Sequence, residues 1–118
     1  MNDRELLELA AKAAGIVGTY VRVHQAYGDQ WVEGIDTGAL VFWNPLTDDG
    51  DALRLAVKLR MDIDISINAG YVSVTAHREP DERVFIVEKP GDSAEALRRA
   101  ITRAAAEIAR TTDTGGEA

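Results

Sequence analysis

The chain has 118 residues, contains no cysteine and carries a formal net charge of -7, with 46% hydrophobic residues. This length fits one domain with a buried core, and the absence of cysteine excludes disulfides, a thiol nucleophile and a thiolate zinc site. The negative charge argues against direct binding to nucleic-acid backbones, which requires clustered lysine and arginine. No apolar run approaches the ~20 residues that span a bilayer, and the first residues are not typical of a signal peptide. The sequence therefore predicts a cytoplasmic protein that is not inserted in a membrane.

The first third of the chain predicts one helix and one strand. Residues 3–14 place apolar side chains at helical spacing, with Asn2 positioned to cap the helix and Gly15 to end it. Residues 19–24 alternate between apolar and polar side chains, as in a half-buried strand. Three glycines break any period over residues 25–38, which are therefore predicted to be an irregular connection, with a short strand at Trp31 and Val32 as the alternative.

An apolar strand over residues 39–43 is expected to end in a tight turn. Pro45 removes a backbone donor and pushes Asn44 out of helical space. The ring of Trp43 is predicted to close one end of the core, with a surface anchor for a partner as the alternative.

A second helix is predicted over residues 48–60. Thr47 and Asp48 offer side-chain oxygens to its free amides, and Asp51 lies in its positively charged first turn. The aspartates superficially resemble a calcium loop, but the alternate-position ligands and the later glutamate of such a loop are missing.

A two-stranded ribbon is predicted over residues 62–68 and 71–77, because apolar and polar side chains alternate in both segments. The predicted register, which keeps like side chains together, pairs Ile67 with Val72, Ile65 with Val74 and Ile63 with Ala76. The opposite face then carries six polar side chains that form the first candidate binding site: Asp62, Asp64, Ser66, Ser73, Thr75 and His77. Their carboxylates and imidazole could hold a divalent metal or act as acid and base, whereas the simpler interpretation is a solvent-exposed sheet face.

Trp31 is the second candidate for a binding side chain, because it lies in the glycine-rich stretch where exposure is expected. No catalytic residue, metal site or cofactor is predicted. The sequence has neither a serine nucleophile elbow nor a phosphate-binding glycine motif, and only His24 and His77 could act as bases.

The last third predicts a strand and a helix. Residues 84–88 are apolar on both faces, which is typical of a strand inside a sheet. Asp92 is expected to begin a helix that carries arginines on its outside, and residues 111–118 are predicted to be a flexible tail. Together the elements predict an α+β fold in one domain, residues 1–110, with three helices on a mostly antiparallel sheet of four to five strands, in the order α-β-β-α-β-β-β-α.

Residues 43–57, with the sequence WNPLTDDGDALRLAV, resemble the signature of the phage ABA sandwich domain, a family of short proteins from bacteriophages and prophages. The resemblance extends to residues 4–15 and 96–101. It implies an α/β/α layered sandwich and expression in a bacterial cytoplasm. It implies no activity and no catalytic residues.

These features favour a non-catalytic phage accessory protein that binds a host or phage protein through an acidic sheet face or the irregular middle. A narrower form is an anti-defence protein whose acidic surface occupies a basic nucleic-acid site on a host nuclease. The alternatives are a small-molecule or nucleotide-binding protein and, more remotely, a metal-dependent hydrolase that uses Asp62, Asp64 and His77. A homodimer through an exposed edge strand is also compatible with the sequence.

Overall fold

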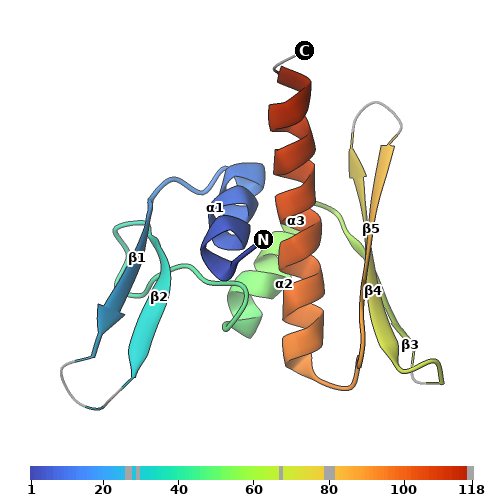
Figure 1. The fold of residues 1–118 in the computed structure, drawn as a ribbon, viewed down its shortest axis with the longest axis horizontal. Helices are drawn as coiled ribbons and strands as arrows, with labels where there is room; N and C mark the ends of the chain where they lie inside the picture. The colour runs from blue at the N-terminus through green and yellow to red at the C-terminus, as the bar shows by residue number, and fades with distance from the viewer. Residues whose placement is uncertain (26–27, 29, 67, 79–81, 117–118) are drawn as a thin grey trace.

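The computed structural model describes the chain except residues 26–27, 29, 67, 79–81 and 117–118. Its elements are α1 (Asp3–Ala14), β1 (Thr19–His24), β2 (Trp31–Asp36), α2 (Asp49–Lys58), β3 (Asp62–Ser66), β4 (Tyr71–Arg78), β5 (Glu82–Glu88) and α3 (Ala94–Gly116). The predicted α+β class, the antiparallel strands and the order of the elements are confirmed (Figure 1).

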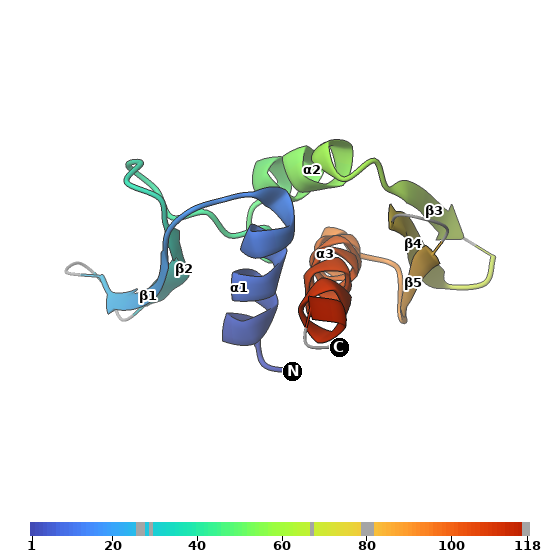
Figure 2. The ribbon, with the colours of Figure 1, turned by 90° about the horizontal axis from the view of Figure 1, so that it is seen from above.

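The strands divide into two sheets instead of joining one. β1 and β2 form an antiparallel pair, and β3, β4 and β5 form a three-stranded antiparallel sheet with β4 in the centre. Figure 2 shows α1 and α3 between the two sheets, with α2 along one side of them. This layer order differs from the α/β/α sandwich that the resemblance implies, because the strands form two outer sheets and not one central sheet. Helix α3 contacts α1, α2, β4 and β5, so it is the element around which the fold is assembled.

The core consists of two clusters that meet near Trp43. The larger cluster surrounds α3 and contains many small side chains, including fully buried Ala10, Ala100 and Ala104. Such small residues allow helices to approach closely, because the distance between helix axes depends on the side chains at the contact. The smaller cluster joins the first sheet to α1 and consists of Leu7, Ala11, Ile35 and Leu46. Trp43 is partly buried and packs against both clusters, as predicted for a core residue.

The middle of the chain differs from the prediction. Trp31–Asp36 is strand β2, although the glycines predicted an irregular connection. Gly34 is needed there for packing, since an added Cβ would lie 2.7 Å from the carbonyl oxygen of Trp43. Residues 39–43 are not a strand: this segment turns outward and forms only an isolated bridge between Trp43 and Ile35.

The predicted register of β3 and β4 is wrong by two residues. Ile63 lies opposite Val74 and Ile65 opposite Val72, while Ile67 is outside the described residues. A shift of two residues keeps every side chain on its predicted face, because side chains alternate with a period of two. The connection is two residues longer than expected, and the amide of Gly70 closes it by donating to the carbonyl of Ser66 at 3.0 Å.

Strand β5 lies at an edge of the second sheet, so the prediction of an internal strand is wrong. Val84 on one face is buried in the core around α3, whereas Phe85 on the other face is 63% exposed.

Helix α3 begins at Ala94 instead of Asp92, and the Ser93 hydroxyl accepts a hydrogen bond from the amide of Ala96 at 3.2 Å. The helix continues to Gly116, beyond residue 110 where the sequence predicts its end.

Candidate functional site

The polar face predicted from the sequence exists on the second sheet. On β4, Ser73, Thr75 and His77 alternate with residues buried in the core around α3, so they lie on the face away from that helix. Asp62, Asp64 and Ser66 lie on the same face of β3, but Ile63 and Ile65 on its other face are 39% and 56% exposed and do not belong to that core. Ser73 is itself buried. Among these six side chains, only His77 and Asp62 approach to ion-pair distance, with Nε2 and Oδ2 3.5 Å apart. Both side chains are largely exposed, so the pair is screened by water.

The polar face offers no metal centre. Within the described residues, no group of three histidine, aspartate or glutamate side chains is placed to hold a metal ion. Asp64 faces Ser73 across the ribbon and does not join Asp62 and His77. The metal-dependent hydrolase interpretation therefore lacks a third ligand among these residues.

Trp31 is 54% exposed, which confirms the predicted exposure. The guanidinium of Arg22 lies 4.6 Å from the centroid of its ring, and the His24 ring meets it edge-on at 5.1 Å. Because these two side chains already contact the indole, less of it is free for a flat ligand.

The turn at Trp43, Asn44 and Pro45 has a structural role. The Asn44 side chain is buried; its Nδ2 donates to the carbonyl of Glu33 and its Oδ1 accepts from the amide of Leu46, both at 2.9 Å. The backbone amide of Asn44 donates to Asp51 Oδ2 at 2.9 Å. The turn thus ties β2 to the start of α2.

Asp48 is the N-cap of α2, as predicted, and accepts from the amide of Asp51 at 2.7 Å. The Asp51 carboxylate contacts Arg54 at 2.8 Å as well as the amide of Asn44. The two carboxylates are therefore engaged in capping and in the turn, which is the predicted alternative to a calcium loop.

The sequence does not predict an apolar ridge that is formed by exposed Leu40 and Val41 and by partly buried Phe42. Leu40 is fully exposed and Val41 is 77% exposed. Figure 2 shows the connection between β2 and α2 projecting from the molecule beside the first sheet. The run of apolar residues after Gly38 predicts a strand, and only the absence of alternating polar side chains in it indicates a different role.

Two grooves flank the apolar ridge. The groove toward the end of α1 has a volume of about 520 Å³ and is lined by Val17, Val41 and Trp43, among others. The groove toward β2 has a volume of about 550 Å³ and is lined in part by Val32 and Leu40. Val17 is itself 87% exposed, so apolar surface continues from the ridge across the first groove.

The groove toward β2 has mainly acidic charged residues in its walls. Glu33, Asp48 and Asp51 line the groove toward β2, together with Arg54. Arg54 lies 2.8 Å from Asp51 and 3.8 Å from Asp48, so one guanidinium is shared between two carboxylates. The apolar ridge therefore has three carboxylates and one guanidinium beside it in the groove toward β2.

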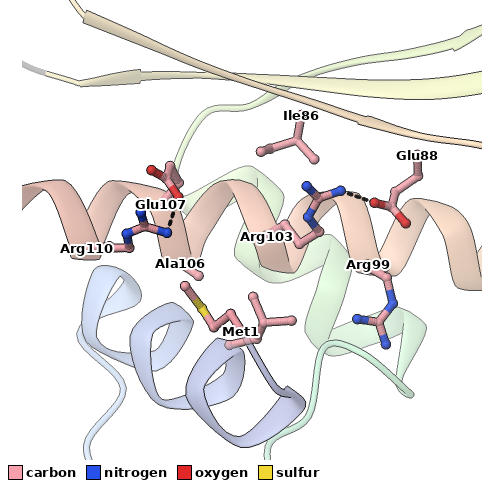
Figure 3. A pocket seen from close by; sticks show the side chains of 9 residues that line it. Met1, Ile86, Glu88, Arg99, Arg103, Ala106, Glu107 and Arg110 are labelled. Carbon is pink, nitrogen blue, oxygen red and sulfur yellow. Dashed lines mark hydrogen bonds and ion pairs between the residues drawn. The ribbon is translucent and has the colours of Figure 1, made fainter.

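A third cavity, of about 370 Å³, lies between α1, α3 and β5 (Figure 3). Three arginines line it, and each has a carboxylate partner: Arg99 contacts Asp3 at 3.3 Å, Arg103 contacts Glu88, and Arg110 contacts Glu107 at 3.6 Å. An anionic ligand would have to compete with these carboxylates.

A fourth cavity, of about 530 Å³, lies at the end of the second sheet beneath the start of α3. Its walls include the apolar side chains of Ile65, Val72 and Leu97 and the backbone around Gly91 and Ser93. Asp92 is the one charged residue in this lining, which is otherwise apolar or uncharged and suited to a small molecule with a largely apolar surface.

Comparison of this chain with models of protein families, with curated proteins and with solved structures finds no match. Over the residues that the structure describes, no helix combines the length and the apolar character needed to cross a membrane.

Proposed function

We propose that this chain is a non-catalytic protein-interaction module that binds another protein through the apolar ridge. The observation that carries the proposal is the exposure of Leu40 and Val41 between two grooves. Burial of a side chain of this size contributes about 1.5–3 kcal/mol, and contiguous exposed apolar surface commonly marks a site of association.

The acidic walls define the chemistry of the partner. A surface that fits the ridge has an apolar pocket with lysine or arginine at its rim, facing Glu33, Asp48 and Asp51. Such complementarity raises the association rate and makes binding weaker at high salt.

The resemblance to the phage ABA sandwich domain supports a phage or prophage accessory protein in a bacterial cytoplasm, where the partner is a host or phage protein. A basic nucleic-acid site on a host nuclease has the required charge, so anti-defence activity is the narrower form of the proposal. Plaque assays in hosts with different defence systems test this form. Equal plating with and without the gene in all of them contradicts it.

The proposal is tested by recovery of partners from bacterial lysate with the tagged chain. We expect the wild-type chain to enrich a partner at low salt, and the double variant Leu40→Ser, Val41→Ser to lose it. Val57→Ser is the matched control, because Val57 is 70% exposed on α2 but lines neither groove. Equal recovery by all three chains, or no enriched protein at any salt concentration, contradicts the proposal.

The second candidate function is small-molecule binding in the cavity at the end of the second sheet, which is supported by the apolar walls formed by Ile65, Val72 and Leu97. The test is mass spectrometry of the protein under native conditions directly after purification. A mass equal to that of the chain alone argues against this candidate.

A further inference from the structure

Strand β5 has the composition of an internal strand but a neighbour on one side only. Val84, Phe85, Ile86 and Val87 follow one another, and β4 is the only strand paired with them in the described chain. Strands that are apolar on both faces normally lie inside a sheet with both faces covered. Phe85, at the middle of β5, is 63% exposed. The sequence pattern and the position of β5 therefore disagree within a single copy.

We propose that a second copy of this chain supplies the missing neighbour, through antiparallel pairing of the two β5 strands around Phe85. A two-fold axis at this residue sets Phe85 opposite Phe85 of the second copy. The two three-stranded sheets then continue into one sheet of about six strands.

In this register, most side chains of β5 lie opposite compatible side chains of the second copy. Val84 faces Ile86 of the second copy on the side that packs against α3, which extends the apolar core across the interface. Phe85 meets its own copy on the outer face, and aromatic cross-strand pairs are among the more stabilising ones. Arg83 faces Val87 of the second copy, so its aliphatic stem covers a partly buried valine.

The register contains one pair of like charges, Glu82 opposite Glu88 of the second copy. Each glutamate already has a guanidinium beside it: Arg78 contacts Glu82, and Arg103 contacts Glu88. Figure 3 shows the side chain of Arg103 reaching Glu88 beside β5, at the end of the strand where Glu82 of the second copy would lie. The arginines therefore offset the repulsion between the two carboxylates.

The other edge of the same sheet disfavours self-pairing. An antiparallel pair of β3 strands centred on Asp64 would set two exposed carboxylates against each other with no arginine in the described contacts of Asp64. Inward or edge charges of this kind are a common protection against edge-to-edge association. Each copy also carries a net charge of -7, so association requires a locally balanced surface, which β5 and its arginines provide.

The absence of cysteine from the chain allows a disulfide test of this register. In the proposed dimer the two Cα atoms at residue 85 lie about 4.5–5.5 Å apart, which is within the span of a disulfide. Residue 83 lies four residues along the strand from its own copy, or about 14 Å away. We therefore expect Phe85→Cys to form a disulfide-linked dimer under mild oxidation, and Arg83→Cys and Asp64→Cys to remain unlinked.

A charge exchange at the same position gives a second readout in sedimentation velocity. Phe85→Asp and Phe85→Lys place like charges opposite each other, so each alone should raise the dissociation constant of the dimer at least about ten-fold. A mixture of the two should recover a heterodimer, because residue 85 then faces its opposite charge. Circular dichroism of each variant checks that the fold is retained, as expected for a position that is mostly exposed.

Two results overturn the proposal. One is a wild-type chain that sediments as a monomer at its highest attainable concentration. The other is a dimer that persists in both charged variants and is not linked through Phe85→Cys. The double variant Leu40→Ser, Val41→Ser should leave the dimer intact, so this proposal and the proposed function can fail independently.

Discussion

Asn44 holds the turn before α2 through hydrogen bonds on both ends of a buried amide. Its Nδ2 reaches the carbonyl of Glu33 and its Oδ1 the amide of Leu46. We predict that Asn44→Ala lowers the free energy of unfolding by about 2–4 kcal/mol, because both backbone groups lose their partner in a buried place. Urea denaturation measures the loss. Asn2→Ala, which removes an exposed cap of α1, should cost only about 1 kcal/mol; equal losses in the two variants contradict the prediction.

Tyr20 is a single residue that makes the stability of the fold depend on pH. Its hydroxyl donates to the carboxylate of Glu33, and this hydrogen bond raises the pKa of Tyr20 above its usual value of about 10. The folded state then holds the proton more tightly than the unfolded state. The resulting stabilisation is complete below the usual pKa and is lost as the pH rises through the raised one.

The measurement is phenolate absorbance during an alkaline titration, with Tyr20→Phe subtracted to isolate this side chain. We expect Glu33→Gln to lower the pKa of Tyr20 and to reduce the stability difference between neutral and alkaline pH. Superimposable titration curves for the wild-type chain and Glu33→Gln would show that the hydrogen bond does not act in this way.

The N-cap of α2 tests how well the sequence predicts the residue at which a helix begins. The sequence offered both Thr47 and Asp48 to the free amides, and the structure assigns the cap to Asp48, which accepts from Asp51. Asp48→Ala should lower the free energy of unfolding by about 1 kcal/mol, whereas Thr47→Ala should change it by less than about 0.5 kcal/mol. Thermal unfolding of both variants provides the comparison. A larger loss of stability in Thr47→Ala than in Asp48→Ala would show that Asp48 is not the main cap of α2.

At the scale of elements, the alternation of apolar and polar residues predicts the face of the sheet on which a side chain lies better than it predicts the residue opposite on the next strand. It placed Ile63 and Ile65 correctly on the face of Val72 and Val74, because any shift by two residues preserves the faces. The register itself depends on the length of the connection, which the sequence around Gly70 does not determine. The same limit explains β2: Gly34 interrupts the local pattern, but its need for close contact with Trp43 arises only from tertiary packing.

At the scale of the whole molecule, the sequence predicts the class and the order of elements but not their division into two sheets. Each hairpin carries its own pattern, and nothing in those patterns states that α1 and α3 lie between them. The apolar ridge was unpredictable for the same reason. Residues 39–42 are as apolar as a strand. They lie outside the first sheet because this segment pairs with it through the single bridge between Trp43 and Ile35.

Arg98 connects parts of the molecule that are distant in sequence. From α3, its Nε donates to the carbonyl of Leu46 at 2.9 Å and its Nη1 to Asp49 at 2.6 Å, and its side chain is 20% exposed. Lysine cannot make both contacts, since it lacks the planar fork of the guanidinium. We predict that Arg98→Lys lowers the free energy of unfolding by about 1–2 kcal/mol, mainly through the bond to Leu46, because Asp49 is itself exposed.

Arg54→Lys is the matched control for this prediction, because Arg54 also contacts an aspartate, at 2.8 Å, but its side chain is 72% exposed. Its substitution should cost less than about 0.5 kcal/mol, and that cost should decrease further at high salt. Denaturation of both variants at low and high salt separates the two cases. If the loss from Arg98→Lys disappears at high salt as the loss from Arg54→Lys does, then Arg98 contributes only a screened surface charge and does not hold α3 against the turn before α2.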